Sequence, residues 1–392
     1  MSIEMPAVQV APATDRRGVQ TLLPRVLFAV ELDPEKKFGT LEEQIVFLSR
    51  QFQAAESLFL PLFICAPGPG KLDLLQQCGV EALCLDLRRF QGASLKVLLR
   101  LVKQHQIDVV HWNFTSPLRN SYLWWLTLLC PSVAHYFTDH SSRWLPLPDP
   151  PRGPKAALAR LLLTRYRKVF CVSRFVQECL AGQGIWSNLL HLQHFVNTER
   201  FRPEGAMRTQ LRTELGAADQ FVVLLVGQLI KAKGAEVLLR ALAQLPDHVV
   251  VWLIGEGEEK EALVQRTGAL GLESRVRFLG LQRNVQPYMQ AADCFVCPSL
   301  WAEAAGLVVL EAAACGLPVL ASRIGGLPEY VEENQGGFLF EPGNHEELAA
   351  LLGRLLGDAE LCRRLGAQAR QRALLHFSPA ARLPEILDLY RR

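Results

Sequence analysis

The sequence predicts an α/β protein of two domains, each built on an open and mostly parallel β-sheet. Short apolar runs typical of buried strands alternate with helical patterns along almost the whole chain. These runs form two similar series, and a charged stretch at 201–220 separates them. At 392 residues the chain is long enough for two domains of ordinary size.

Within each series, strands and helices follow one another in turn. In the first series the predicted strands are 25–30, 58–66, 80–86, 109–113, 132–138 and 168–173, with helices such as 40–53 and 93–105 between them. In the second series they are 221–227, 249–255, 276–280, 293–298, 318–322 and 336–342. Strands that are apolar at nearly every position are expected in a parallel sheet with helices on both faces.

The chain is expected to have five segments. They are a disordered polar tail at 1–20, a first domain at 21–200, a linker at 201–220, a second domain at 221–376 and a C-terminal helix at 377–392. The linker contains Pro203 and Gly205, which interrupt regular structure. Open α/β sheets bind ligands at the carboxyl ends of their strands, so we expect a ligand crevice between the two domains.

The composition predicts a globular cytoplasmic protein. Hydrophobic residues make up 49% and charged residues 21%, and no apolar run approaches the ~20 residues of a membrane-spanning helix. The N-terminus lacks the basic-then-apolar order of a secretory signal. The ten cysteines are scattered, mostly inside apolar runs, which is typical of reduced core residues.

One segment, 152–170, carries six basic residues and no acidic one. They are Arg152, Lys155, Arg160, Arg165, Arg167 and Lys168. Because Leu158, Leu161, Leu162 and Tyr166 fall near one helical face, the segment could lie peripherally on the anionic inner face of a membrane. The alternative is a core-packed helix with a solvated basic side. Nucleic acid is not expected as a partner, since no basic–aromatic reading module is present.

The most informative feature is a pair of glutamates, Glu303 and Glu311. Glu303 follows the strand-like run 291–297, in the loop at the carboxyl end of a strand. Gly306 then allows close backbone approach where a helix could begin, and Glu311 lies in the first turns of that helix. A helix start offers free N–H groups to an anion. An anion site beside two hydroxyl acceptors suits a phosphate attached to sugars.

This stretch, EAAGLVVLEAAACGLPV, resembles the E-x7-E motif of the retaining family 4 glycosyltransferases, E-G-F-G-L-x-x-x-E-A-x-A-x-G-x-P-V. The resemblance implies a GT-B fold, in which two Rossmann-like domains face a central cleft and the last helix packs back on the first domain. It implies that Glu311 holds the nucleotide ribose. Glu303 and the following loop, with Gly306 and Leu307, would hold the transferred sugar and the diphosphate. Without the motif, the two glutamates could be one loop residue and one helix-surface residue.

A second stretch, GQLIKAKG, follows the strand that ends at Gly227. Lys231 and Lys233 lie at a strand-to-helix turn, where they could neutralise a diphosphate, or could simply be solvated. The stretch resembles the family pattern G-R-x-x-x-x-K-G, in which Arg and Lys clamp the donor diphosphate. Lys233 takes the Lys position, whereas Gln228 replaces the Arg, and Lys231 could compensate for the lost cation.

The segment RVRFLGLQRN, 275–284, resembles the family segment whose backbone meets the nucleotide base. By that resemblance, main-chain groups of Gly280 and Leu281 would recognise the base. The alternative is an ordinary strand end.

In the first domain, His140 follows a strand in a loop that would face the crevice. The family often has T-x-H at this place, and its His reaches the donor sugar or the leaving phosphate. A lone His in a polar loop is otherwise usually solvated. Gly39 is the one glycine that remains where the family has a Gly-Gly loop over the donor phosphate.

By resemblance, the chain is a retaining hexosyltransferase that uses a nucleoside-diphosphate sugar as co-substrate and a glycan or lipid-linked hydroxyl as acceptor. No other cofactor and no metal is expected, because there is no D-x-D motif and lysine and the helix dipole supply positive charge. Gln228, Ala304 and Ala305 depart from the family pattern, which leaves open a binding protein that has lost activity. A sugar phosphorylase is a further alternative, against which the ribose-directed Glu311 argues.

Overall fold

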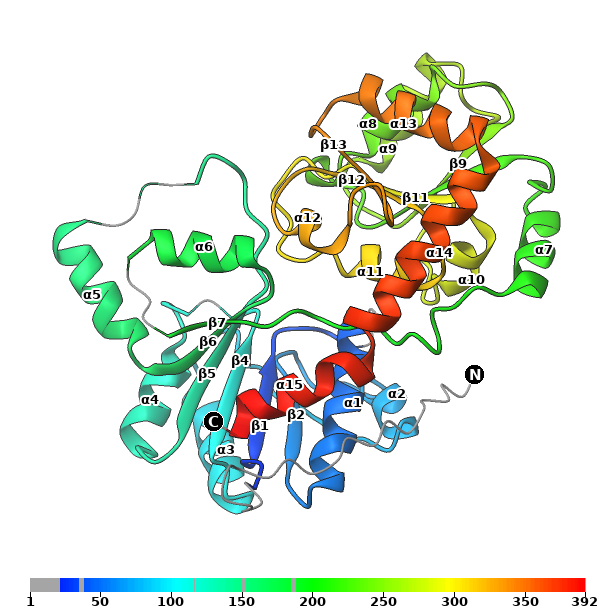
Figure 1. Cartoon of the computed structure of the whole chain (residues 1–392). Coiled ribbons are helices and arrows are strands. Elements are labelled where there is room, and N and C mark those ends of the chain that lie inside the picture. Colours follow the sequence, from blue (N-terminus) through cyan, green and yellow to red (C-terminus); the bar gives the residue numbers. More distant parts are fainter. Residues whose placement is uncertain are drawn as a thin grey trace. The chain divides into compact units, whose positions relative to one another are not determined.

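The computed structural model of the chain describes residues 22–34, 39–115, 117–147, 149, 152–184 and 188–391. The predicted tail at 1–20 therefore lies outside the described residues. The chain divides into two units, drawn in Figure 1. The first comprises Met1–Ser141, Leu147–Gln193 and Pro379–Arg392, and the second comprises Ser142–Pro146 and His194–Ser378.

Within the described residues, the first unit is built on seven parallel strands in the order β3-β2-β1-β4-β5-β6-β7. The strands are β1 (Val26–Val30), β2 (Phe59–Phe63), β3 (Leu83–Cys84), β4 (Val109–Asn113), β5 (Ala134–Asp139), β6 (Tyr166–Cys171) and β7 (Leu189–His191). The helices are α1 (Thr40–Ala54), α2 (Asp73–Gln77), α3 (Gly92–Gln104), α4 (Ser121–Leu129), α5 (Gly153–Leu163), α6 (Arg174–Gly182) and α15 (Pro379–Arg391). Chain order reverses between β1 and β4, the point at which such sheets bind ligands.

The C-terminal helix α15 is part of the core of this unit (Figure 1). Its Tyr390 ring packs against His111, Tyr136 and Phe170, which come from three neighbouring strands. The Tyr390 hydroxyl is hydrogen-bonded to Nδ1 of His111, whose Nε2 lies 2.6 Å from Oγ1 of Thr138. A buried polar pair of this kind fixes one arrangement of helix and sheet, because moving the helix would leave the Tyr390 hydroxyl and Nδ1 of His111 without each other as hydrogen-bond partners.

The second unit, over its described residues, is built on six parallel strands in the order β10-β9-β8-β11-β12-β13. The strands are β8 (Phe221–Val226), β9 (Val249–Ile254), β10 (Val276–Phe278), β11 (Cys294–Cys297), β12 (Val319–Ser322) and β13 (Gly337–Phe340). The helices are α7 (Gly205–Glu214), α8 (Ala235–Leu242), α9 (Lys260–Ala269), α10 (Gln286–Ala291), α11 (Leu307–Ala314), α12 (Leu327–Tyr330), α13 (His345–Gly357) and α14 (Ala359–His376), with a 3-10 turn at Lys231–Lys233. Strands β9 and β11 are buried along their whole length, since helices cover both faces of the sheet.

The prediction of a linker at 201–220 is wrong. Half of this stretch forms α7, and the division between the two units falls between Gln193 and His194. Helix α7 is tied to the second unit because Arg208 and Arg212 both form ion pairs with Asp293, at the start of β11. Two of the charges in this stretch therefore serve packing.

The prediction of one helix over 152–170 is also wrong. Helix α5 ends at Leu163, and β6 begins at Tyr166. In β6 the side chains of Tyr166 and Lys168 are buried whereas Arg167 is exposed, which is the alternation of a strand. Lys168 donates to the carbonyl oxygen of Leu389 and lies 4.9 Å from the Tyr136 ring centroid, so it is a core residue. Strand β7 was not predicted at all.

Candidate active site

The loops at the carboxyl ends of β8, β9, β10 and β11 interlock through backbone contacts. A Cβ on Gly234 would lie 1.9 Å from the carbonyl oxygen of Pro298, so the turn after β8 touches the end of β11. A Cβ on Gly255 would lie 1.8 Å from the carbonyl oxygen of Gly227. The Gly255 N–H donates to the carbonyl of Gly280 at 2.9 Å. No residue larger than glycine fits these places, and the loops are thereby held in fixed positions.

This packing joins Lys233 to Glu303. The Lys233 Nζ lies 2.6 Å from Glu303 Oε1, and the same oxygen accepts from Ser299 Oγ at 2.7 Å and from Trp301 Nε1 at 2.9 Å. Burial raises the pKa of Glu303, but the charge of Lys233 and these hydrogen bonds outweigh burial and hold that pKa below its usual value. Glu303 is therefore a buried carboxylate at neutral pH, paired with a lysine whose side chain is 25% exposed.

A short segment that interrupts the first unit in sequence lies against the loop that follows β11. We call this segment, Ser142–Pro146, the strap; it belongs to the second unit. Arg143 and Ala302 form an antiparallel bridge with N–H···O distances of 2.9 and 2.8 Å. The Trp144 and Trp301 rings meet with centroids 6.2 Å apart.

The strap also reaches the second oxygen of the carboxylate. Ser142 Oγ donates to Glu303 Oε2 at 3.3 Å and accepts from the Ala304 N–H at 3.1 Å. Ala304 and Ala305, which stand where the family motif has Gly and Phe, are 4% and 7% exposed. The loop after β11 is thus covered on the side that the strap occupies.

Helix α11 starts next to this loop. Gly306, its N-cap, has a φ of +76°, and a Cβ there would lie 2.6 Å from Leu327 Cδ2. Gly306 therefore permits the abrupt change from loop to helix. The Gly326 N–H donates to the carbonyl of Glu303 at 2.7 Å and fixes the loop from the other side. In the first turn the Val309 N–H donates to the Gly306 carbonyl at 2.9 Å. The Leu307 and Val308 N–H groups precede the first intrahelical donor and favour an anion.

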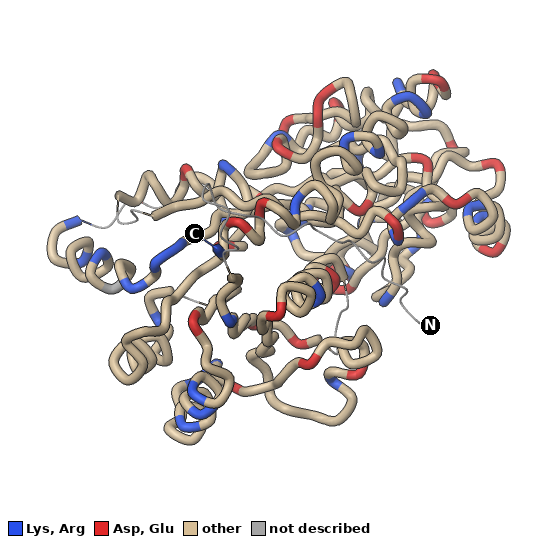
Figure 2. The backbone as a smooth tube through the Cα atoms, turned by 60° about the horizontal axis from the view of Figure 1, so that its bottom comes forward, with Lys and Arg blue, Asp and Glu red and all other residues tan. Residues whose placement is uncertain are grey.

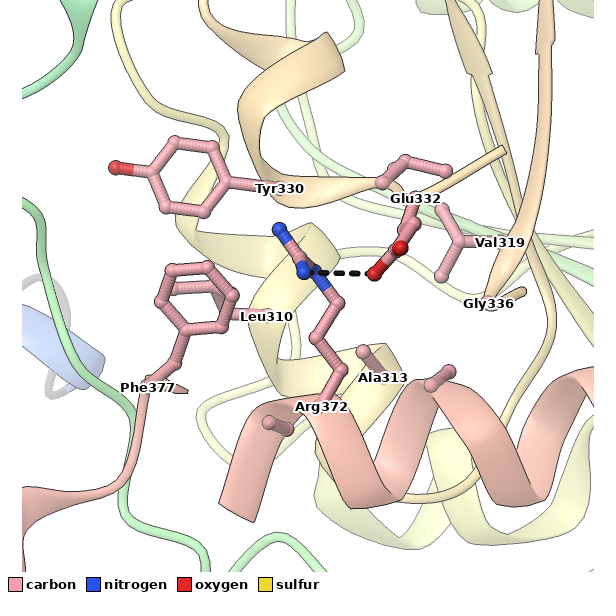
Figure 3. A pocket seen from close by; sticks show the side chains of 11 residues that line it. Leu310, Ala313, Val319, Tyr330, Glu332, Gly336, Arg372 and Phe377 are labelled. Carbon is pink, nitrogen blue, oxygen red and sulfur yellow. Dashed lines mark hydrogen bonds and ion pairs between the residues drawn. The ribbon is translucent and has the colours of Figure 1, made fainter. Parts of the chain in front are cut away.

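Glu311 lies on α11 and is 6% exposed, so it is not a surface glutamate. The inner side of α11 is anchored beside a cavity of about 10 Å³, whose lining Figure 3 shows. There Leu310 and Ala313 face α14, and Arg372 of α14 pairs with Glu332 at 2.8 Å. A cavity of this volume has room for about one water molecule, so it is part of the packing and not a substrate site.

The two other residues predicted for the diphosphate lie apart from the ion pair. Gln228 is exposed just after β8, where a longer cation would be free to extend. Lys231 is also exposed, and it lines a groove that it shares with Glu236 of α8 and His345 of α13. Ion pairing to Glu303 thus belongs to Lys233.

The residues predicted to meet the base lie just after β10. Gly280 has a φ of +66°, and its carbonyl is used by the Gly255 N–H. Leu281 is 65% exposed. A ligand could therefore reach the Leu281 backbone and side chain without displacing any core residue.

In the first unit, His140 lies directly after β5. Its Nε2 is 3.1 Å from Oδ1 of Asn113, and its ring stacks on Phe114 with centroids 4.2 Å apart and planes 11° apart. Asn113 ends β4, so three residues at the carboxyl ends of two adjacent strands form one cluster. Phe114 has a φ of +59°, a conformation that costs free energy for a bulky residue.

Gly39, predicted to cover the donor phosphate, is the N-cap of α1. Its N–H donates to Oε2 of Glu42 at 2.8 Å. Residues 35–38, the remainder of that predicted loop, lie outside the described residues.

The basic segment presents apolar side chains outward. On α5, Leu158 is 56% and Leu161 59% exposed, whereas Ala159 and Leu163 are buried. Lysine and arginine, and no acidic residue, occur along α5 (Figure 2). The core-packed alternative therefore does not describe Leu158 and Leu161. No helix in the described part of the chain is long and apolar enough to cross a membrane.

Three residues of the site were not singled out from the sequence. Ser299 and Trp301 both donate to Glu303, and Ser142 contacts it from the strap. Ser299 and Trp301 stand within four positions of Glu303 at a strand end, and that proximity was a usable signal. Ser142 is 161 positions away, and no local pattern marks it.

Two family models match most of the chain. Residues 207–372 match the model described as glycosyl transferases group 1, and residues 63–200 match glycosyltransferase family 4. The chain is 30% identical over 317 residues to a GDP-mannose-dependent alpha-(1-6)-phosphatidylinositol monomannoside mannosyltransferase of Mycolicibacterium smegmatis, covering 74% of this chain and 78% of the relative. It is 35% identical over 202 residues to the lipopolysaccharide core biosynthesis glycosyltransferase LpsD of Rhizobium meliloti, covering 51% and 57% of the two chains.

Solved structures show the same architecture at lower identity. HepE of Anabaena, in complex with UDP and glucose, has a TM-score of 0.78 at 23% identity, over 93% of this chain and 99% of that one. Sucrose-phosphate synthase of Thermosynechococcus elongatus has a TM-score of 0.75 at 21% identity, over 94% and 98%.

Proposed function

The chain belongs to the family 4 glycosyltransferases and has their GT-B fold, both as the sequence predicted, and from this premise we propose its reaction. It moves a hexose from a nucleoside-diphosphate sugar to a hydroxyl of a glycan, lipid-linked or other glycoconjugate acceptor, with retention at the anomeric carbon. The observation that carries the proposal is the ion pair of Lys233 with the buried Glu303, 2.6 Å apart, beside the start of α11. It combines a cation, an anion-binding helix start and a hydroxyl acceptor in one loop cluster.

Lys233 and the first-turn amides after Gly306 stabilise the departing diphosphate, which is where negative charge grows in the transition state. Lys233 can do so without stranding its partner. Its ammonium has three donors, and Glu303 Oε1 keeps the bonds from Ser299 and Trp301 when Lys233 turns toward a phosphate. The carboxylate then remains charged and able to accept hydroxyls of the transferred sugar.

The rest of the donor is assigned by the same resemblance. Glu311 anchors the ribose, Gly280 and Leu281 meet the base, and Gly227 and Gln228 lie near the diphosphate. From the first domain, His140 contacts the donor sugar or the leaving phosphate, and Asn113 and Phe114 orient its ring.

The chemical step breaks the bond from the anomeric carbon to the diphosphate oxygen and forms one to the acceptor oxygen on the same face. The acceptor's proton passes to the leaving diphosphate, so the protein supplies no separate general base. No metal or other cofactor takes part in this scheme. Activity should therefore survive treatment with EDTA.

The substrates remain a class rather than a compound. One relative uses GDP-mannose by its name, whereas HepE is described in complexes with UDP and UDP-glucose. Both bases are therefore included in the proposal. The phosphatidylinositol mannoside in the first relative's name supports a lipid-linked acceptor.

A lipid-linked acceptor would require contact with a membrane surface, and α5 is the element that fits it. Exposed Leu158 and Leu161 supply apolar contact, and Lys155 and Arg160 on the same helix supply attraction to anionic headgroups. Co-sedimentation with vesicles rich in phosphatidylglycerol tests this. The double change L158S/L161S should reduce binding, and binding equal to that of the unchanged protein would contradict the assignment.

The test of the reaction is release of UDP or GDP from a panel of UDP- and GDP-hexoses, with glycan and lipid-linked acceptors. NMR of the product's anomeric proton reports retention. A protein stabilised thermally by UDP or GDP that transfers no sugar would be a binding protein. Stabilisation by inorganic phosphate without a nucleotide effect would indicate a phosphorylase.

A further inference from the structure

The strap covers the carboxylate that the proposed donor sugar needs. Glu303 is 5% and Ala304 is 4% exposed. Among the described residues, Glu303 Oε2 has one hydrogen-bond partner, Ser142 Oγ, and the Ala304 N–H donates to that same oxygen. A sugar cannot reach these two groups while Ser142 occupies them.

The two contacts have the chemistry of a bound sugar hydroxyl. A hydroxyl can donate its single proton to a carboxylate and accept from an amide at the same time. Ser142 does both, with the carboxylate and the amide of two successive residues. We propose that Ser142 stands in for a hydroxyl of the donor sugar, and that the strap must leave its place before the sugar can bind. This inference rests on the proposed function of Glu303.

Backbone, ring and side-chain contacts hold the strap beside Glu303. Two backbone hydrogen bonds, between Arg143 and Ala302, and the contact of Trp144 with Trp301 fix it. The 3.3 Å bond from Ser142 is the longest of the four that the Glu303 carboxylate accepts, so it is the first that a better-placed hydroxyl would replace.

Displacement should depend on the sugar and not on the nucleotide. Over the described residues, the hydrogen bonds of Ser142 Oγ are with Glu303 and Ala304, and not with Lys233 or the first turn of α11, which are assigned to the diphosphate. Free UDP or GDP could therefore bind with the strap in place. The nucleotide sugar has to exchange its hydroxyl for that of Ser142, and its affinity is reduced accordingly.

The variants S142A and S142T separate this role from others. Calorimetric titration compares UDP with UDP-glucose, and GDP with GDP-mannose, on both variants and on the unchanged protein. Removing one such hydroxyl should tighten binding of the nucleotide sugar about tenfold and leave the free nucleotide unchanged. S142T keeps the hydroxyl and should bind like the unchanged protein.

Each other outcome has a distinct meaning. If S142A weakens binding of the nucleotide sugar, or lowers kcat with KM unchanged, then Ser142 positions Glu303 and the inference is overturned. Equal gains for nucleotide and nucleotide sugar would also overturn it. If no nucleotide or nucleotide sugar binds any of the proteins, the proposed function itself fails.

A measurement on the unchanged protein covers the case in which S142A does not fold. Hydrogen exchange of the Arg143 and Ala302 amides, which donate the two bridge hydrogen bonds, should accelerate on adding UDP-glucose or GDP-mannose, whichever binds, and not on adding UDP or GDP. Unchanged or slower exchange with the bound nucleotide sugar would show that the strap stays, contrary to the proposal.

Discussion

The two units place polar groups at the carboxyl ends of their strands by different means. In the second unit the loops themselves interlock. Glycines such as Gly234 and Gly255 bring backbone against backbone, and Lys233 is carried to Glu303 by that packing. In the first unit, contacts between side chains position the polar groups. His140 is held by a hydrogen bond to the side-chain oxygen of Asn113 and by stacking on Phe114, above a core in which polar groups pair with α15.

This difference has consequences for energy and for chemistry. Backbone contacts that only glycine permits leave little freedom, so the second unit can present a buried charge pair at small cost in reorganisation. Side-chain clusters adapt more easily, and a stacked imidazole is better suited to adjusting to a ligand. We therefore expect changes at the second unit's ion pair to have larger effects than changes at the first unit's His140.

The largest effect is expected for K233M. The change removes the cation assigned to the leaving diphosphate, and transfer should fall about a thousandfold, or about 4 kcal/mol in kcat/KM. The loss of stability should be smaller than the loss of activity, so the melting temperature should fall only modestly, because Ser299 and Trp301 still donate to the buried carboxylate. Steady-state kinetics and thermal unfolding measure the two effects.

The matched control is R363M, which removes a cation from the exposed Arg363–Glu360 pair on α14. Surface pairs contribute little, so neither activity nor melting temperature should change appreciably. A K233M enzyme with near-normal activity would remove the ion pair from the mechanism and with it the main contrast between the units.

The next effect concerns stability in acid and should arise in the first unit. Burial lowers the pKa of His111 to about 3 and that of His135 to about 4, and the rings and hydroxyls around His111 include no carboxylate. Below the unfolded pKa of ~6.5 the unfolded chain takes up protons that the folded chain refuses. Stability should therefore fall as the pH drops from about 6.5 toward 4, by about 2 kcal/mol at pH 5 for each histidine.

Urea unfolding at pH 5, 6, 7 and 8 measures this, with hydrogen exchange to locate the change in the first unit. Between pH 7 and 8 these histidines are neutral in both states and contribute no slope. The change H111F should reduce the slope between pH 6.5 and 5 by about half. If the loss of stability at low pH instead lies wholly in the second unit, the buried histidines do not determine the acid stability of the first unit.

A smaller effect is expected for H140A. Loss of the stacked imidazole should lower kcat/KM by about 10- to 100-fold, or about 1.4–2.7 kcal/mol, with little change in melting temperature because the residue is partly exposed. H140Q, which keeps a side-chain partner for Asn113, should lose less. A loss at His140 larger than that of K233M would reverse the comparison.

The contrast also explains what could be read from the sequence. The site in the second unit was predictable because Glu303, Gly306 and Glu311 are close in sequence and each has a local geometric reason for its identity. Ser142 was not, because its partner lies 161 positions away. The prediction of where α5 ends was wrong for the same reason. Lys168 looks like one more surface cation until Leu389, 221 positions on, supplies its acceptor.

Helix α7 was missed in the sequence for a related reason. Its charged sequence has the composition of a linker, and only the distant Asp293 turns Arg208 and Arg212 into packing residues. Strand β7 was missed because its three residues, LLH, are too few to form a pattern. Local geometry is encoded locally, whereas charges that serve the core acquire their role from partners elsewhere in the chain.

The smallest effect is a gain, expected for Q228R. The family pattern has an arginine at this position, and Gln228 is exposed just after β8 at the loop cluster that holds Lys233. A second cation there should tighten binding of UDP or GDP about three- to fivefold, because a guanidinium can donate two hydrogen bonds to a phosphate. An exposed, salt-screened cation contributes no more than about 1 kcal/mol, so the gain should shrink as salt is raised.

The control Q210R adds the same charge on the outer face of α7, far from the loops in sequence, and should leave affinity unchanged. Titration with UDP and GDP at low and high salt decides. Equal gains in affinity for both variants would reflect net charge alone. A gain confined to Q228R would mean that the second unit's loops form a diphosphate subsite in which this chain has one of the family's two cations.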